Sequence, residues 1–208
     1  MDFYLYLIGE KNLFKDDESY LEALERCFSS GIEAFQLRQK DVSDKVFIEL
    51  GLKIKSLLAK YPRVKFFVND RVDAALALGA YGVHLNKNSI PVKEVKNKIN
   101  NLKIFYSSHS VEESIRAEEE GADFIAFSPV FKTKGLEFGQ GVDALRAAVE
   151  SVSVPVFALG GINEGNAAEL FNSGCSHIAV QSAILKRDDI EAAVKGLINA
   201  FKFQINAY

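Results

Sequence analysis

Polar and basic residues follow several short apolar runs of the sequence, in a pattern that could bind an anionic substrate. Gln36, Arg38 and Lys40 alternate at the end of one run. Because side chains along an extended chain point alternately to two sides, these three share one face. Ser107 and Lys134 follow two later runs. Their hydrogen-bonding and positively charged groups predict a binding site for a negatively charged small molecule.

A pair of adjacent glycines gives a second signal of the same kind. Gly160 and Gly161 precede Ile162 after one apolar run, and Gln181 and Ser182 follow the next. Glycine has no side chain to keep the backbone away from an anion, and backbone N–H groups at such places bind phosphate. We therefore predict a pocket for a phosphorylated small molecule. The alternative is that the glycine pair only forms a tight turn.

One of the three histidines has the surroundings expected of a proton carrier. His109 follows an apolar run and is flanked by serines. The ordinary histidine pKa of about 6.5 suits proton transfer at neutral pH. The alternative for His109 is a capping or structural role. His84 and His177 lie within apolar runs, and we interpret both as interior side chains.

An amide and a carboxylate follow another apolar run. Asn69 and Asp70 stand at its end. A carboxylate there could hold a cation, or it could bind a hydroxyl or amine of the substrate. The alternative is an ion pair between Asp70 and the neighbouring Arg71.

Eight strands must position these side chains. Four of them follow a small-residue turn that begins at Gly31, Gly79, Gly121 or Gly174, and the spacing of these glycines fits two strand–helix units each. The other four expected strands cover residues 3–8, 65–69, 103–107 and 155–159. Amphipathic segments lie between the strands and predict helices. Ser43, Ser110 with Glu113, and Asn163 are the expected helix starts.

The alternation predicts an α/β protein, a single-domain (β/α)₈ TIM barrel of parallel strands over residues 1–208, with an outer ring of helices. Nearly continuous apolar strands in the second half indicate a parallel sheet buried on both faces. A doubly wound open sheet is the alternative. The even repeat disfavours it, and the one glycine pattern of dinucleotide-binding type, which begins at Gly139, does not follow a strand. In barrels of this kind the active site lies at the C-terminal ends of the strands, where the polar residues above would meet.

Composition excludes several other classes of protein. The 208 residues include 25 Lys and Arg against 28 Asp and Glu, and no basic cluster that would predict nucleic acid as a partner. No apolar run approaches the roughly 20 residues that span a bilayer, so we expect no membrane insertion and a cytoplasmic location. Cys27 and Cys175 stand alone, which predicts neither zinc nor a disulfide framework. The aromatic tail over residues 201–208 could cover a barrel edge or form a homo-oligomer contact.

Taken together, these motifs resemble the thiamine phosphate synthase and thiazole tautomerase superfamily over nearly the whole chain. The similar fragments are residues 36–40, 69–76, 82–85, 107–110, 121–127, 129–131, 160–162 and 180–184. Each fragment alone is weak, but their order and spacing are specific to the superfamily. The resemblance implies a small phosphorylated thiazole as substrate.

The synthase branch implies a Mg²⁺-dependent transferase. In that reaction a pyrimidinylmethyl pyrophosphate loses pyrophosphate, and the nitrogen of thiazole phosphate captures the resulting cation. The resemblance assigns the pyrophosphate to Arg38, Lys40, Asn69, Ser107 and Lys134. It makes Asp70 one Mg²⁺ ligand, but Ser89 stands where the family has its second carboxylate. The family's Pro-Thr-x-Thr-Lys loop is also changed, around Thr133.

These departures make the tautomerase branch our main expectation. Such an enzyme aromatises a carboxythiazole phosphate without a cofactor, and the resemblance makes His109 its proton carrier. The resemblance places the phosphate on Gly160, Gly161 and Ser182, with Arg38 or Lys40 on the substrate carboxylate. The retained Asp70 argues against this branch. Two alternatives stay open: the Mg²⁺-dependent synthase, and a non-catalytic protein that binds thiazole phosphate or thiamine phosphate.

Overall fold

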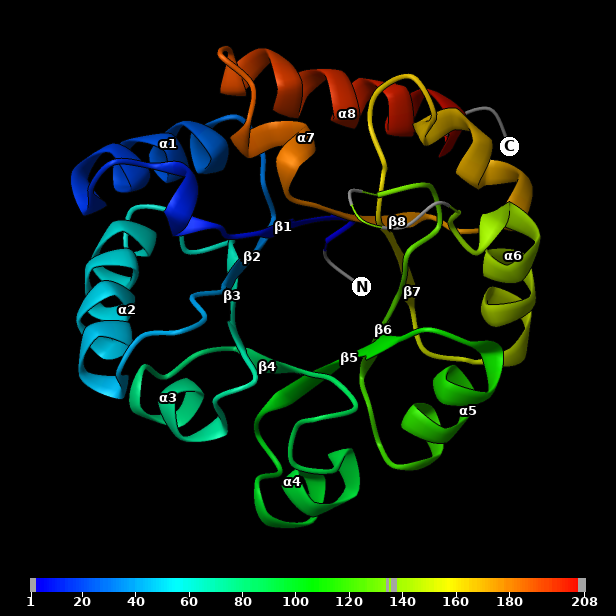
Figure 1. Cartoon of the computed structure of the whole chain (residues 1–208), viewed down its shortest axis with the longest axis horizontal. Coiled ribbons are helices and arrows are strands. Elements are labelled where there is room, and N and C mark those ends of the chain that lie inside the picture. Colours follow the sequence, from blue (N-terminus) through cyan, green and yellow to red (C-terminus); the bar gives the residue numbers. More distant parts are fainter. Residues whose placement is uncertain (1–2, 134, 136–137, 206–208) are drawn as a thin grey trace.

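Eight parallel strands close into a barrel, and helices surround it (Figure 1). The computed structural model describes residues 3–133, 135 and 138–205. The strands are β1 (Leu5–Ile8), β2 (Ala34–Leu37), β3 (Lys65–Asn69), β4 (Gly82–Leu85), β5 (Lys103–Ser108), β6 (Phe124–Phe127), β7 (Val156–Leu159) and β8 (His177–Val180). Neighbours pair in chain order, and β8 returns to β1. The predicted (β/α)₈ barrel is therefore confirmed, and the open sheet is excluded.

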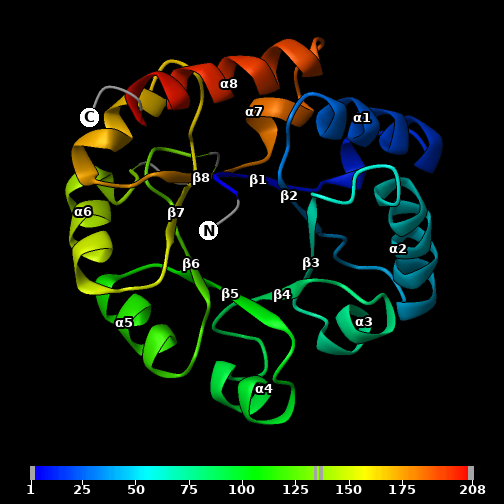
Figure 2. The same cartoon turned by 180° about the vertical axis from the view of Figure 1, so that it is seen from behind.

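The outer ring contains both α-helices and 3₁₀ helices. They are η1 (Lys11–Leu13), α1 (Asp17–Ser29), α2 (Asp44–Leu58), α3 (Val72–Ala77), α4 (Val92–Lys98), α5 (Val111–Glu119), α6 (Gly141–Ser151), η2 (Ala167–Ser173), α7 (Ser182–Leu185) and α8 (Ile190–Ile205). Seen from behind, α1 to α6 follow one another in chain order around the barrel, and α8 lies between α6 and α1 (Figure 2). No helix in the described part of the chain is long and apolar enough to cross a membrane.

Two of the three expected helix starts are confirmed. The Ser43 side chain accepts a hydrogen bond from the Val46 N–H at 3.4 Å, and Ser110 accepts one from the Glu113 N–H at 3.1 Å. The third prediction is wrong. The Asn163 side chain accepts from the N–H of Gly165 and so closes a local turn, and the segment that follows is the 3₁₀ helix η2.

The repeated glycines share one structural position. Gly31, Gly79, Gly121 and Gly174 follow α1, α3, α5 and η2, and their φ angles of 112°, 57°, 101° and 73° are all positive. Glycine adopts this conformation without the clash that a Cβ atom causes. Each glycine therefore ends a helix and turns the chain toward the next strand, which explains the repeat.

An aromatic plug fills the interior of the barrel at the N-terminal ends of its strands. The segment before β1 lies at the centre of the barrel in both views (Figures 1 and 2). Its Phe3 ring lies 5.4 Å from the rings of Phe124 and Phe157, and Phe67 and Phe105 complete the cluster. This end is closed by apolar contacts. Ligand access is therefore confined to the opposite mouth.

Candidate active site at the mouth of the barrel

A layer of polar side chains lies above the aromatic plug. The amide nitrogen of Gln36 donates to the Tyr6 hydroxyl at 2.9 Å and also contacts Nδ1 of His84. Nε2 of His84 lies 2.9 Å from Oγ of Ser107. Gln36 and His84 are buried, and Asn69 stands beside His84 in the register of β3 and β4. The structure thus brings together three of the predicted site residues, namely Gln36, Asn69 and Ser107.

His84 and Tyr6 are both uncharged at neutral pH. Burial, with a smaller effect from the charge of Arg38, lowers the pKa of His84 to about 3. Burial likewise raises the pKa of Tyr6 well above its ordinary value. Both rings stack on Phe105, with centroids 5.2 Å and 4.5 Å away. The layer formed by Tyr6, Gln36 and His84 is the polar floor of the mouth, and it therefore carries no charge of its own. His84 is the interior histidine that the sequence predicts, whereas His177 is only half-buried, at the other end of the barrel.

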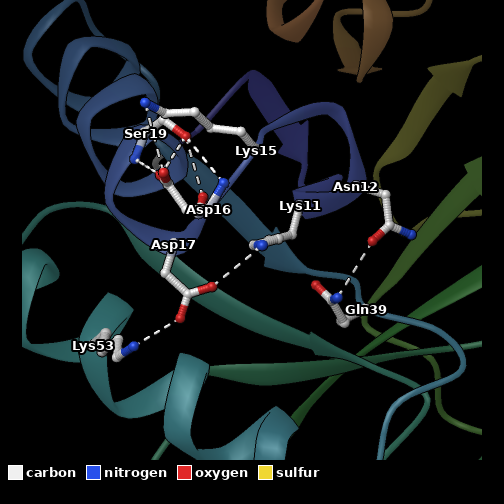
Figure 3. A network of polar contacts seen from close by, with 8 residues as sticks. All are labelled: Lys11, Asn12, Lys15, Asp16, Asp17, Ser19, Gln39 and Lys53. Atoms are coloured by element: carbon white, nitrogen blue, oxygen red, sulfur yellow. Dashed lines mark hydrogen bonds and ion pairs between the residues drawn. The ribbon is translucent and has the colours of Figure 1, made fainter.

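A second polar cluster consists of Glu10, Arg38 and Gln181, which follow β1, β2 and β8. Glu10 follows β1, and its Oε2 atom accepts hydrogen bonds from Arg38 at 3.0 Å and from Gln181 at 3.1 Å. Sequence reasoning missed Glu10, although it stands at a strand end as the other candidates do. The segment that carries Glu10 is itself anchored, because Asp17 pairs with Lys11 at 3.4 Å and with Lys53 of α2 at 2.7 Å (Figure 3).

The glycine pair lies beside a pocket of about 420 Å³. Predicted residues that line it are Gly160, Gly161, Ile162, Gln181 and Ser182, and Glu10, Thr133 and Lys186 lie there too. The sequence could have pointed to Lys186, because it stands one helical turn after Ser182. All five residues predicted to bind phosphate thus meet in one place.

The glycine backbone forms a tight turn, and some N–H groups beside it have no partner among the described residues. The φ angles of Gly160 and Gly161 are 99° and 68°. A Cβ atom on Gly161 would lie 2.6 Å from the Lys132 carbonyl oxygen, so packing alone already requires glycine. Its carbonyl accepts from Asn166 at 2.9 Å. Among the residues that the structure describes, none accepts a hydrogen bond from the N–H groups of Gly160, Gly161 or Ser182. These three groups are the donors that an anion in the pocket could use.

His109 stands at the end of β5 in an exposed position. Its Nδ1 atom lies 2.8 Å from the carbonyl oxygen of Ser128, which can only accept. Nδ1 therefore carries the proton of the neutral ring, and Nε2 is the basic atom. The His109 N–H donates to the Glu113 carboxylate at 2.7 Å, so this carboxylate does not close the expected capping box on Ser110. No hydrogen bond of His109 within the described residues reaches another predicted site residue.

Asp70 is exposed at the end of β3 in a conformation that is unusual for its type. Its φ angle is 64°, and its N–H donates to the His84 carbonyl at 2.9 Å. This region is uncommon for a residue with a Cβ atom, although Asp adopts it more readily than most, and Asp41 does so as well with a φ angle of 60°. Arg71 pairs with Asp44 at 2.9 Å, so the alternative ion pair with Asp70 is not formed.

The residues at the mouth match only part of a magnesium site. Ser89, at the position where the resemblance implies a second carboxylate, accepts a hydrogen bond from the Asn86 N–H at 2.8 Å. The described residues contain no group of three His, Cys, Asp or Glu side chains that could hold a metal. Asp70 alone fits a Mg²⁺ ion that is held mainly by phosphate oxygens and water, as on a pyrophosphate. Lys40 is exposed near this edge, and the predicted site residue Lys134 lies outside the described residues.

Known proteins of one family match this chain over nearly its whole length. A family model described as thiamine monophosphate synthase matches residues 5–184. A thiamine-phosphate synthase from Pyrococcus furiosus is 40% identical over 195 residues, which are 93% of this chain and 92% of the relative. One from Ruminiclostridium cellulolyticum is 37% identical, over 97% of this chain and 96% of the relative.

Solved structures agree with this result. The structure of a thiamine phosphate pyrophosphorylase from Pyrococcus furiosus superposes with a TM-score of 0.88 at 35% identity, covering 97% of this chain and 96% of that one. The chain therefore belongs to the thiamine monophosphate synthase family of thiamine-biosynthesis enzymes.

Proposed function

We propose that this protein is a thiamine-phosphate synthase, a transferase that joins a pyrimidine pyrophosphate to thiazole phosphate. The observation that supports this choice best is that Glu10 links Arg38 to Gln181, and so links the two candidate anion sites of the mouth. The curated relatives at 40% and 37% identity carry the synthase name as well. The comparisons thus favour the synthase alternative over the tautomerase that the sequence departures led us to expect.

The first site would take the pyrophosphate. Arg38 and Lys40 supply positive charge, and Asn69 and Ser107 supply hydrogen bonds. In the proposed reaction the bond between the methylene carbon of the pyrimidine and the pyrophosphate oxygen breaks, and its electron pair leaves on that oxygen. The thiazole nitrogen then donates its lone pair to the carbon. Arg38 and Ser107 would stabilise the charge that develops on the leaving group.

The polar floor suits a cationic intermediate. Protonated imidazole beneath the pyrimidine would repel the developing positive charge, whereas the neutral ring of His84 does not. The aromatic plug of Phe3 and Phe105 closes the barrel below this floor. Water from that side is therefore kept from the cation that the thiazole must capture.

Asp70 would hold the magnesium ion of the pyrophosphate substrate, together with phosphate oxygens and water. When bound, this ion would neutralise charge on the departing pyrophosphate. The exposed position of Asp70 and the single carboxylate fit an ion that arrives with the substrate.

The second site would take the phosphate of the thiazole. The N–H groups of Gly160, Gly161 and Ser182 are its donors, and Lys186 adds positive charge at the rim of the pocket. Gln181 and Glu10 line this pocket on the side of Arg38, so the thiazole ring would project toward the centre of the mouth. The geometry therefore supports a direct transfer between two bound substrates.

A turnover assay tests this function. Purified full-length protein is mixed with thiazole phosphate, pyrimidine pyrophosphate and Mg²⁺, and thiamine phosphate and released pyrophosphate are measured in equal amounts. Arg38→Ala should lower kcat/KM by at least about a hundredfold, because it removes a charged contact to the leaving group. Arg63→Ala, on the loop before β3 at the opposite end, serves as the matched control. Absence of thiamine phosphate with the wild-type protein would exclude the synthase.

The tautomerase is the second candidate, and one specific observation favours it. Ser89 replaces a metal carboxylate, and metal-free proton transfer needs no such group. His109 has the basic Nε2 atom that this chemistry requires. The protein is therefore also given carboxythiazole phosphate without metal, and His109→Asn is compared with the wild type. Tight binding of thiazole phosphate without turnover in either mixture would leave the binding protein as the remaining function.

A further inference from the structure

We propose that His84 is a positioning residue for Ser107. As the tautomer that carries its proton on Nε2, it donates to the Ser107 hydroxyl and thereby directs the hydroxyl proton toward the anion in the mouth. The inference rests on the proposed function in one respect, which is that Ser107 binds pyrophosphate.

The neighbours of Nδ1 determine the tautomer. The Gln36 amide nitrogen contacts Nδ1, and an amide N–H can only donate. The Tyr6 hydroxyl lies 3.2 Å from the same atom and already accepts from Gln36 at 2.9 Å, so its own proton is available to Nδ1. The Gln36 N–H therefore requires the lone pair of Nδ1, and the Tyr6 hydroxyl is compatible with this arrangement. The only proton of the neutral ring must then lie on Nε2.

Burial disfavours a second proton on the ring. The side chain of His84 is 3% exposed, and such burial penalises the charged form of an imidazole. Stacking holds the ring in place, because its plane lies within 22° of Phe105 and within 18° of Tyr6. His84 therefore presents one fixed donor toward the mouth, namely Nε2–H.

Ser107 receives this donor. Its Oγ atom lies 2.9 Å from Nε2, and a hydroxyl that accepts there must send its own proton elsewhere. Ser107 is half-buried and lies near the C-terminal end of β5. The neighbouring Ser108 points away from the lumen and bonds to Ser114 of α5, so it cannot share this role. The remaining direction for the Ser107 proton is the mouth, where pyrophosphate oxygens can only accept.

The tautomer can be read directly in the full-length protein. Histidine is labelled with ¹⁵N, and the ring nitrogens of His84 are assigned by comparison with His84→Gln. We expect a protonated Nε2 and an unprotonated Nδ1 at about pH 7. Protonated Nδ1 would overturn the proposal, because Ser107 would then donate to His84. This readout does not depend on turnover.

A double-mutant cycle tests whether His84 acts through Ser107. Inorganic pyrophosphate with Mg²⁺ is titrated by calorimetry into wild type, His84→Phe, Ser107→Ala and the double variant. Phenylalanine keeps the stacked shape but has no donor. We expect each single variant to bind about tenfold more weakly, and the double variant to match Ser107→Ala. If the affinity losses of the two single variants simply multiplied in the double variant, His84 would act independently of Ser107, and the proposal would fail.

Two further variants separate positioning from folding. His84→Gln keeps a donor near the place of Nε2 and should recover most of the lost affinity. His177→Phe is the matched control, because this histidine also stacks on a tyrosine, Tyr4, with ring centroids 5.3 Å apart, but at the far end of the barrel. It should leave pyrophosphate affinity unchanged. Equal losses in His84→Gln and His84→Phe, with intact thermal unfolding, would contradict the donor role.

The outcomes for the two proposals can be told apart. A protein that binds pyrophosphate with the expected tautomer and a non-additive cycle, yet makes no thiamine phosphate, would support the positioning role and exclude the synthase. A protein that makes thiamine phosphate with His84 protonated on Nδ1 would support the synthase and exclude the positioning role.

Discussion

Glu10 and Arg38 form an ion pair of 3.0 Å between the residues that follow β1 and β2. Their side chains are 22% and 30% exposed, so water screens the pair only in part. The same carboxylate oxygen accepts from Gln181 at 3.1 Å, and Gln181 lines the glycine pocket. A single carboxylate thus connects the two proposed anion sites and offsets the charge of Arg38 while the mouth holds no anion.

Replacing Glu10 by glutamine should strengthen anion binding. The Glu10→Gln side chain still accepts from Arg38 and Gln181, but it no longer offsets the positive charge of Arg38. We expect inorganic pyrophosphate to bind about fivefold more tightly, since a partly exposed ion pair contributes about 1 kcal/mol. Calorimetry at low salt measures the change. Glu25→Gln, which removes the exposed pair with Lys60, is the control. Weaker binding by Glu10→Gln would show that the charge of Glu10 is needed to hold Arg38 in place.

The sequence predicts the barrel well because its signals are local. Each repeat glycine needs a positive φ angle, and each strand is an apolar run, so both can be read without knowing the partners. Only the start of the helix between β7 and β8 is predicted wrongly, because Asn163 can either cap a helix or close a turn. The contact with Gly165, which decides between them, cannot be read from residue type.

The site is harder to predict from the sequence, because it depends on contacts between strands. The strand-end rule places Gln36 and Ser107 at the mouth, but their link through His84 depends on the register of four strands. No sequence motif marks Glu10 either. Its partners are Arg38 and the distant Gln181, and these contacts also depend on how the strands pair. Residue types thus identify the mouth, whereas the barrel determines which of them touch.

Gly161→Ala should weaken both the fold and the phosphate site. A Cβ atom there meets the Lys132 carbonyl oxygen at 2.6 Å, and the φ angle of 68° is strained for alanine. We expect a loss of about 2 kcal/mol in unfolding free energy and a clear loss of thiazole phosphate affinity. Gly135→Ala is the control, since its φ of 89° carries strain but, apart from its chain neighbours, no atom of the described residues lies within 4 Å of an added Cβ. Equal losses of phosphate affinity in both variants would mean that the effect is not local to the pocket.

Asp123 should stabilise the barrel in a pH-dependent way. Partial burial disfavours its charged form, but hydrogen bonds from Lys103 at 2.7 Å, Lys96 at 2.8 Å and the Ile104 N–H outweigh that effect and lower its pKa. A lowered pKa gives stability that is present above the unfolded value of about 3.9 and is lost as pH falls through the native value.

Urea unfolding of Asp123→Asn measures this contribution. We expect the variant to lose about 2 kcal/mol at neutral pH, and the difference from wild type to shrink below about pH 3. Asp143→Asn is the control, because that side chain is 96% exposed in its pair with Arg146. A difference that stays constant with pH would show that the loss comes from shape and not from charge.

Ser89→Asp should restore the second metal carboxylate of the family. Ser89 Oγ accepts from the Asn86 N–H at 2.8 Å, and an aspartate oxygen can accept the same hydrogen bond, so the loop should keep its shape. A second carboxylate after β4, the strand that pairs with β3 before Asp70, would increase the attraction for a hard divalent cation. We expect the Mg²⁺ concentration for half-maximal synthase activity to fall several-fold, while Asp70→Asn raises it. Asp73→Asn, in the first turn of α3, is the control for loss of charge near this edge. If Ser89→Asp left the Mg²⁺ requirement unchanged while Asp70→Asn raised it, position 89 would lie outside the reach of the ion, and the ion would be held by Asp70 and the substrate alone.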